Sequence, residues 1–375
     1  MHDVQLLVEG LAYSGWKSLG IRRSLEDFAR SFDVTFNDRW SERATPVPIR
    51  KGQSFQLLVD GVVLITGHID DTSRGYDARQ HTLQATGRSN TGDLVDCHAV
   101  VSKGKRRRWE AGATIQRIAT DLCQPFSIAV GGPTVTDVLT APLPKAFAVE
   151  RGERVFEALS RLADLKGLLL QTSVHGDVVF TRAGTKKVAT VLSYAHNILS
   201  CQQRSSDRDR FSHYVFRGQT TADDDTSGQA STQIRGFAVD DAITRYRPYE
   251  VSAMVQSDNR DLGFRALWER NTRAGRSETL TYTVRGWSHA DGLWSPNTLV
   301  DVDDGRANVR DTLLISGVNL RATAQEGYLS ELELVDRRTY DVVGAPKPKP
   351  KAVARRPQRP RDGRIDIPRR NPGVL

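Results

Sequence analysis

The segment Gln53-Ser-Phe-Gln-Leu-Leu-Val-Asp-Gly-Val-Val-Leu-Ile-Thr-Gly67 places two apolar runs on either side of Asp60-Gly61. An Asp-Gly pair tolerates the positive φ angles of a tight hairpin turn, so the segment predicts two antiparallel strands. His81-Thr-Leu-Gln-Ala-Thr-Gly87 alternates apolar and polar residues and should pair nearby. Short strands punctuated by Gly and Asp predict a small β-barrel or sandwich over the first hundred residues.

A helical pattern follows. Thr114–Cys123 places Ile115, Ile118, Ala119 and Leu122 on one face, and Pro125 should end that helix. A second helix is predicted from Glu153 to Lys166, with Gly167 as its C-terminal cap. Strands predicted at Leu168–Gln171 and Asp177–Thr181 complete an α+β insert.

Strand patterns return after residue 210 and are interrupted by one further helix, predicted from about Asp261 to Arg273. The polar stretch from Thr220 to Thr232, which contains Asp223-Asp224-Asp225, predicts a loop. The remaining predicted strands are Phe211–Arg217, Leu280–Arg285, Thr312–Ser316 and Tyr328–Val335.

The net charge of +8 is confined to the C-terminal segment 345–375, which has ten Lys or Arg and two acidic residues. The rest of the chain holds 43 basic and 43 acidic residues, so its composition does not favour nucleic acid as a partner. The tail is rich in proline and like charges, which predicts an extended segment. Three interpretations remain open: a solvated extension, a segment that docks on an acidic face of a neighbouring protein, or a segment that lines a negatively charged passage.

Composition narrows the class of protein further. The three cysteines, Cys97, Cys123 and Cys201, form no C-x-x-C pair and are interpreted as buried thiols rather than as a disulfide or zinc framework. The first residues lack the pattern of a signal peptide, and no apolar run reaches the roughly 20 residues of a membrane span. We therefore expect synthesis and folding in a cytoplasm, with no membrane anchor.

Catalytic signatures are missing from the sequence. It contains no phosphate-binding loop, nucleophile elbow or zinc-protease motif, and no two of its eight histidines stand four residues apart. Glu150 and Glu153 flank a helix start, where capping explains them better than acid–base chemistry. Asp301-Val-Asp-Asp304 lacks the spacing of a calcium loop and is interpreted as a turn. No catalytic, cofactor-binding or metal-binding residue is predicted, and no cofactor.

Two clusters keep alternative interpretations. Lys103-Gly-Lys-Arg-Arg-Arg-Trp109 could contact phosphate or a membrane surface, although a solvated loop or the rim of a protein interface is favoured. Trp287 and Trp294 bracket an Asp-Gly turn and could bind sugar, although a packed hairpin or a protein interface is favoured.

Taken in order, several stretches resemble the baseplate hub family of contractile-tailed phages, in particular the Mu-like hubs also described as tail protein P or late control D-like proteins. The most specific are Gly87–Cys97 and Tyr282–Val302. The others are Gly15-Trp16, Ile21–Phe32, Gly67–Asp70, Glu150–Val155, Arg208–Tyr214 and Arg245–Tyr249.

The resemblance implies an α+β, mainly β fold with two small tube-like β-barrels per chain and α+β insert domains, assembled as a pseudo-sixfold trimer. The implied domains are a first barrel at 1–96, an α+β insert at 97–199, a second, discontinuous barrel at 200–235 and 280–343, a helical insert at 236–279, and the basic tail at 344–375.

The implied function is structural: a homotrimer that adapts the sixfold tail tube to the threefold central spike, and that contacts other baseplate proteins in the virion tail. It would be synthesised and assembled in the host bacterial cytoplasm. Two alternatives are a tail-tip cell-wall hydrolase and the hub portion of a secretion-system spike. The family offers no catalytic residues to carry over.

Overall fold

A computed structural model describes residues 2–37, 48–77, 81–99, 107–218, 234–252 and 259–340. In it 49% of residues lie in strands and 17% in helices, which confirms the mainly β prediction. The basic tail, the loop at 220–232 and residues 103–106 of the basic cluster lie outside the described residues.

The elements follow one another in three groups. The N-terminal group is β1 (Val4–Val8), β2 (Leu11–Tyr13), β3 (Trp16–Ser24), β4 (Ser31–Asn37), β5 (Ser54–Val59), β6 (Val62–Tyr76) and β7 (His81–Ser89). The middle group is α1 (Gly92–Asp96), β8 (Arg108–Trp109), α2 (Ile115–Cys123), η2 (Gln124–Phe126), β9 (Val130–Gly131), α3 (Thr136–Thr140), β10 (Phe147–Ala148), α4 (Val155–Asp164), β11 (Leu169–Thr172) and β12 (Val178–Thr181).

The C-terminal group begins with two strands that return to the large sheet and then makes a small domain of its own. It comprises β13 (Lys187–Ser193), β14 (Ile198–Ser205), β15 (His213–Gly218), β16 (Ile234–Val239), β17 (Pro248–Ser252), α5 (Asn259–Ser277), β18 (Glu278–Arg285), β19 (Ser288–His289), β20 (Gly292–Leu293), β21 (Leu299–Asp304), β22 (Val309–Thr323), β23 (Gly327–Val335) and η3 (Arg337–Thr339).

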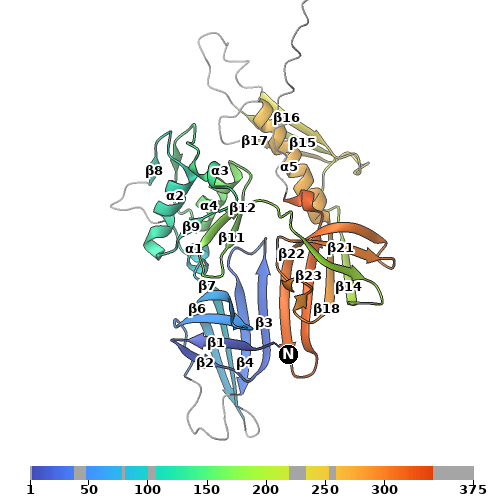
Figure 1. The fold of residues 1–375 in the computed structure, drawn as a ribbon. Helices are drawn as coiled ribbons and strands as arrows, with labels where there is room; N and C mark the ends of the chain where they lie inside the picture. The colour runs from blue at the N-terminus through green and yellow to red at the C-terminus, as the bar shows by residue number, and fades with distance from the viewer. Residues whose placement is uncertain are drawn as a thin grey trace, which may run out of the picture. The chain divides into compact units, whose positions relative to one another are not determined.

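A 13-stranded sheet joins the two ends of the chain. Its strands run in the order β14-β18-β23-β22-β3-β4-β7-β6-β5-β1-β2, with β21 beside β22 and β13 beside β21 (Figure 1). The predicted hairpin at 53–67 is confirmed: Asp60 and Gly61 connect β5 to β6 with φ angles of 51° and 76°. Positive φ at both turn residues matches the right-handed twist of the flanking strands.

One hydrophobic core serves both halves of this sheet. Ile21, Leu57 and Leu83 from the N-terminal strands share a cluster with Tyr282 and Leu320 from the C-terminal ones. These side chains are fully buried or nearly so because alternate residues of each strand point to the same face. The two halves are therefore held together by both backbone pairing and apolar contact.

The middle group has a separate core. The predicted helices at 114–123 and 153–166 are confirmed as α2 and α4. Thr114 caps α2, because its hydroxyl accepts a hydrogen bond from the backbone N–H of Arg117 at 3.2 Å. Gly167 follows α4 with a φ of 56°, as a C-terminal cap requires. Both helices bury one apolar face in a cluster shared with β12.

A third core forms where β15, β16 and β17 pair in a three-stranded sheet against α5. Tyr214, Leu262 and Ala266 are its fully buried members. The segment 236–279, expected as a helical insert, contains most of β16 and all of β17 in addition to α5. It is therefore a mixed α+β unit. Strand β15, expected in the second barrel, pairs here instead.

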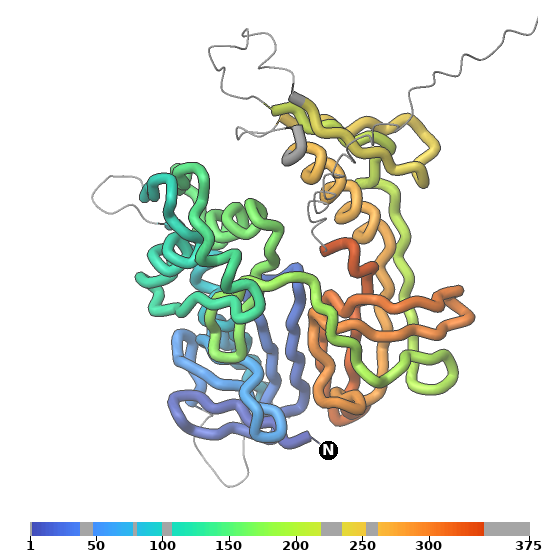
Figure 2. The backbone as a smooth tube through the Cα atoms, turned by 45° about the horizontal axis from the view of Figure 1, so that its top comes forward, coloured from blue at the N-terminus to red at the C-terminus, as the bar shows by residue number. Residues whose placement is uncertain are grey.

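The strand pairings also differ from the expected arrangement at residues 187–199. β13 pairs with β21, and β14 pairs with β18, so both strands belong to the large sheet rather than to the middle group (Figure 2). Asp301-Val-Asp-Asp304 is a strand and not the turn that was expected. Alternate burial of Val300 and Val302 drives the strand, and the turn follows at Gly305.

The interpretation of the cysteines holds for one of the three. Cys123 is buried on α2, and burial raises the pKa of its thiol to about 12. Cys97 and Cys201 are exposed, because they follow a helix end and lie on an edge strand, respectively.

Candidate functional site: the open edges of a repeated sheet

The large sheet is built from the same strand order twice. In the N-terminal half the order is β3-β4-β7-β6-β5-β1, and in the C-terminal half it is β14-β18-β23-β22-β21-β13. Each strand of one order occupies the same place along the chain as its counterpart in the other. The outermost pair departs from the rule, because β1 runs antiparallel to β5 whereas β13 runs parallel to β21. The two halves are structural equivalents of each other.

Irregularities of the ladder recur at equivalent positions. The β3–β4 register shifts between Trp16 and Ser18, and the β14–β18 register shifts between Ile198 and Ser200. The β6–β7 register shifts between Ile69 and Asp71, and the β22–β23 register shifts between Ile315 and Gly317. A β-bulge bends its strand and increases the local twist, so matching bulges give the two halves the same bend at the same place.

The chain also approaches the long strands in the same way in both halves. The backbone N–H of Gly52 donates to the carbonyl of Ile69 at 2.7 Å, and that of Asn297 donates to the carbonyl of Ile315 at 2.8 Å. Gly52 and Asn297 both have a positive φ, of 82° and 65°. Beyond this point β5 no longer pairs with β6, and β21 no longer pairs with β22. One edge of β6 and one edge of β22 are therefore available to another partner.

In the C-terminal half that available side is filled from within the chain. Residues 317–323 of β22 pair antiparallel with residues 18–24 of β3. Leu320 faces Ile21 across this junction, and both side chains are fully buried. Arg22 adds an ion pair with Asp27 at 2.7 Å and a longer one with Glu333 at 3.6 Å. This junction is the seam that joins the two halves.

The counterpart of that side in the N-terminal half is an open edge. Beyond Ile69, β6 pairs with β7 alone among the described strands. Residues 73–76 are all exposed, and the side chain of Tyr76 is 84% exposed, stacked only on His81. A large exposed aromatic side chain beside an unpaired stretch of backbone is typical of a protein interface.

The other open edge is β14, the counterpart of β3. Within the described ranges it pairs with β18 alone (Figure 1), and residues 199–205 are exposed on both faces. Leu199 is 51% exposed, and Arg204 is the one charged residue of the strand. Natural edge strands are usually protected by several charges, proline or a covering element. An eight-residue edge without these features indicates a surface that a partner covers.

A network of ion pairs holds the β-bulge at which the open part of β6 begins. The guanidinium of Arg88 on β7 donates to Asp70 at 2.7 Å and to Asp96, the last residue of α1, at 2.6 Å. Hydrogen bonds from Arg88 lower the pKa of Asp96. All three groups are partly exposed, so the network positions the bulge more than it stabilises the fold.

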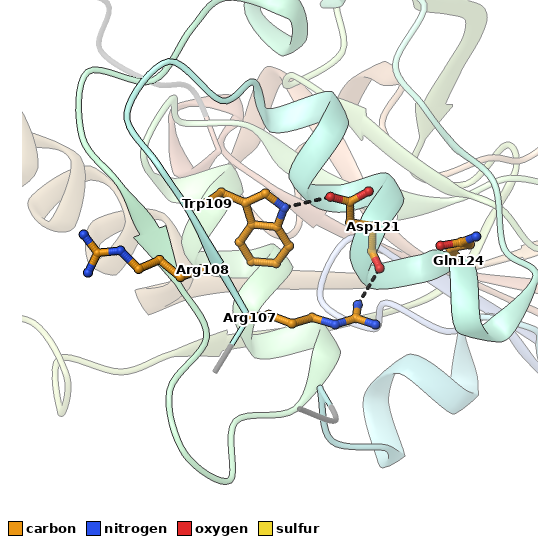
Figure 3. Close-up of a pocket in the computed structure, with 5 residues that line it drawn as sticks. All are labelled: Arg107, Arg108, Trp109, Asp121 and Gln124. Atoms are coloured by element: carbon orange, nitrogen blue, oxygen red, sulfur yellow. Dashed lines mark hydrogen bonds between the residues drawn. The ribbon is translucent and has the colours of Figure 1, made fainter. Parts of the chain in front are cut away.

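The described part of the basic cluster at 103–109 is used inside the molecule. Trp109 donates its indole N–H to a carboxylate oxygen of Asp121 on α2 at 2.7 Å, and Arg107 donates to the backbone carbonyl of the same residue (Figure 3). Arg108 points away and pairs with Glu110 at the surface (Figure 3). Gln124 completes a shallow hollow here. Arg107 and Trp109 therefore hold the loop end against α2.

The tryptophan pair forms a packed hairpin. Trp287 is fully buried and donates its indole N–H to the carbonyls of Arg321 on β22 and Leu329 on β23. Trp294 is also buried, and its backbone N–H donates to the carbonyl of Trp287 at 3.0 Å. With both ring faces enclosed in the core, the pair stabilises the sheet and does not present a stacking platform for sugar.

The acidic candidates also have structural roles. The Glu153 carboxylate, 7% exposed, accepts bonds from Arg161 at 2.6 Å and from the backbone N–H of Glu150 at 2.7 Å. In the described ranges no group of three or more His, Cys, Asp or Glu side chains could hold a metal ion. No helix in those ranges combines the length and apolar character needed to cross a bilayer.

Sequence patterns did not identify the open edges. β14 is exposed on both faces, so it lacks the alternation that marks a half-buried strand, and Tyr76 stands alone in a polar segment. The available signal was indirect: two long hairpins of similar length, at residues 62–89 and 309–335, occur in one chain.

Comparison with known proteins agrees with this architecture. A family model described as Mu phage baseplate assembly protein GpP-like, N-terminal, matches residues 3–89. One described as baseplate hub protein gp44-like, second domain, matches residues 91–182, and one described as Mu phage baseplate assembly protein GpP, fourth domain, matches residues 259–342.

Whole-chain relatives cover nearly the same range. Baseplate hub protein gp44 of Escherichia phage Mu is 32% identical over 346 residues, which are 90% of this chain and 89% of that protein. The crystal structure of a 43 kDa tail protein of prophage MuSo2 from Shewanella oneidensis matches with a TM-score of 0.79 and 30% identity, over 90% of this chain and 99% of that one.

A more distant protein shares this fold. The E. coli protein c3393, a component of the type VI secretion system, matches with a TM-score of 0.53 and 12% identity over 88% of this chain and 76% of that one, a likeness in fold alone.

Proposed function

The chain belongs to the family of Mu-like phage baseplate hub proteins, and from this premise we propose that it forms a homotrimer whose six barrel halves make a pseudo-sixfold ring. It is a structural component of the phage tail rather than an enzyme, as its relatives are. The ring would adapt the sixfold tail tube on one face to the threefold central spike on the other.

The repeated strand order carries this proposal. A heterologous contact closes into a ring only when its rotations complete a circle. Two equivalent halves per chain let three chains offer six similar units to a sixfold partner while the inserts keep a threefold arrangement for a spike. The seam between β22 and β3 supports the model, because it is one junction of such a ring already formed inside the chain.

The strand pairings support a proposed domain division close to the one expected from the sequence. The first barrel would be 1–96, and the second would combine 187–206 with 278–340. The inserts would be 97–186, with its own core, and 207–277, built from β15–β17 and α5. Tail tube, spike and other baseplate proteins would be its partners in the virion tail, after synthesis in the host cytoplasm.

A mass measurement in solution tests the proposal. Light scattering after size exclusion, with and without a candidate central spike protein, should give the mass of three 41.7 kDa chains or a complex containing three. A chain that stays monomeric in the presence of the spike would contradict the trimer.

The tail at 345–375 has a separate proposed role, because its charge differs from that of the neutral body. It would dock on an acidic face of a neighbouring baseplate protein. Deleting 345–375 should then weaken incorporation into tails, whereas unchanged incorporation and infectivity would refute the docking role.

The two alternative functions receive less support. The type VI likeness is one of fold, and whole-chain identity lies with a phage hub and a prophage tail protein. In the acidic pair considered for hydrolysis, the Glu153 carboxylate is ion-paired with Arg161 and accepts a hydrogen bond from the backbone N–H of Glu150.

A further inference from the structure

We infer that residues 71–77 of one chain, along the open edge of β6, pair antiparallel with residues 200–206 of a second copy, along the open edge of β14. This inference rests on the proposed trimer and names the interface that closes it. It states the register of the contact, so it can fail while the trimer itself stands.

The register follows from the equivalence of the two halves. The bulges align Asp71 with Gly317 and Ser18 with Ser200, so β6 corresponds to β22 and β14 corresponds to β3 at fixed offsets. Within the chain, Gly317 pairs with Ser24 and Thr323 pairs with Ser18. Transferred to the open edges, the pairs between two copies are Asp71 with Ser206, Thr72 with Ser205, Ser73 with Arg204, Arg74 with Gln203, Gly75 with Gln202, Tyr76 with Cys201 and Asp77 with Ser200.

The partner must be another molecule. In the sheet order, β18, β23, β22, β3, β4 and β7 lie between β14 and β6 of the same chain. The same edges on a second and third copy can meet head to tail and close a ring, since the contact is heterologous. Two other described strands lie at an end of the sheet. β2 has three residues and cannot supply a ladder of this length, and β13, which pairs with β21, is hydrogen-bonded at Ala189 and Thr190 to Asp291 and Ala290.

The chemistry of the two edges suits this pairing. Tyr76, the most exposed large apolar side chain of the sheet, would lie beside Cys201, which lies next to the buried Tyr282. In the intrachain seam the same two positions hold Ala322 and Leu19, both buried. Tyr76 would therefore be covered on its core-facing side, as its counterpart Ala322 is.

Charge also agrees with the register. Arg204 would stand diagonal to Asp71, which lies two residues along the ladder from Ser73 and on the same face. Diagonal neighbours across antiparallel strands lie about 7–8 Å apart, within reach of an arginine side chain. The counterpart of Arg204 in the intrachain seam is Arg22, which forms ion pairs with Asp27 and Glu333.

The hydrogen-bond pattern indicates where a cross-link fits. The backbone N–H of Leu25 donates to the carbonyl of Ser316 at 2.7 Å, so this pair is of the hydrogen-bonded kind. Alternation along an antiparallel ladder then makes Arg22 and Asn319 a non-hydrogen-bonded pair, with closer side chains. Their counterparts, Arg204 and Ser73, are both exposed and are the best site for an engineered disulfide.

The test is oxidative cross-linking in a background of Cys97→Ser and Cys201→Ser, which leaves only the buried Cys123. The double variant Ser73→Cys with Arg204→Cys should give covalent trimer as the main species on a non-reducing gel, and reduction should return it to monomer. Each single variant should give no covalent trimer. Ser73→Cys with Gln202→Cys, shifted by two residues, is the register control and should cross-link far less.

A second readout needs no engineered disulfide. Cys201 should react with a thiol reagent in dilute, dissociated protein and be protected in the trimer, while Cys97 reacts in both. Tyr76→Asp should cause loss of the trimer without a change in the far-ultraviolet circular dichroism of the monomer. Val62→Asp, at an exposed position of the same strand outside the proposed contact between copies, should leave the trimer intact.

The outcomes separate the seam from the trimer. A trimeric mass combined with equal cross-linking in the register control would overturn the proposed β6–β14 contact between copies and leave the trimer intact. A trimeric mass with Cys201 as reactive as in the monomer would do the same. A monomeric mass without cross-links would overturn both.

Discussion

Removing the side chain of Ile21 tests whether the intrachain seam holds the two halves together. Ile21 lies opposite Leu320, and neither is accessible to solvent. Ile21→Ala deletes three buried carbon atoms, each worth about 0.8 kcal/mol of transfer free energy, or about 2.4 kcal/mol together. The cavity that remains adds to this, so we expect the free energy of unfolding to fall by about 3–4 kcal/mol.

The matched control is Gln203→Ala, at the equivalent position of β14, where the side chain is exposed. In monomeric protein this change should alter the free energy of unfolding by no more than about 0.5 kcal/mol. Urea unfolding followed by tryptophan fluorescence is a suitable assay, because Trp287 and Trp294 lie in the same core. The double variant Ile21→Ala with Leu320→Ala should cost less than the sum of the two single changes, since their cavities merge.

The reasoning would be refuted by a loss below about 1 kcal/mol for Ile21→Ala, far under the range for buried large-to-small changes. Equal losses for Ile21→Ala and Gln203→Ala would refute it as well, because the argument depends on one junction being made in the monomer and its counterpart being open.

Three further changes test other parts of the structure. Gly67→Ala should destabilise by more than about 2 kcal/mol in urea unfolding, because its new Cβ would lie 1.9 Å from the carbonyl oxygen of Arg88, whereas Gly263→Ala has open space and should stabilise its helix by about 0.5–1 kcal/mol. Glu153→Gln should cost about 1–3 kcal/mol in the same assay, since it weakens a charge-assisted bond to a nearly buried carboxylate, and no measurable loss would contradict that role. The pKa of Asp96 is lowered from 3.8 by hydrogen bonds from Arg88, so its stabilisation is present above that value and disappears as the pH falls through the folded-state pKa; unfolding curves of Asp96→Asn and wild type should converge in acid and separate at neutral pH.

Local patterns predicted the elements that bury a single face. The 53–67 hairpin, α2 and α4 each show a period that matches their burial, and turn or capping residues mark where they begin or end. The segments 187–199 and 301–304, which contain β13 and most of β21, were placed wrongly for a common reason. These two strands pair with each other across more than a hundred residues of chain, and no short window of sequence contains that information.

The candidate interface was less predictable than the fold. Its two edges are rich in Ser, Gln and Gly, which resemble loop residues when read locally. They become distinctive only beside the equivalent seam, where the same ladder positions hold Ile21 and Leu320. The resemblance to phage hubs identified the family but did not locate these residues, because interface positions are not fixed by its motifs.

The covalent link between the two halves would change the thermodynamics of forming the proposed ring. When β22 meets β3, the loss of translational freedom is limited by the chain itself, so this junction forms during folding at a high effective concentration. A ring of six independent barrels would require six intermolecular junctions, each with its own association cost, whereas three linked pairs require three. Such a hub can close at lower protein concentration than an unlinked one, and weak individual edges suffice, so that free chains need not stick to one another before the tail is ready to receive them.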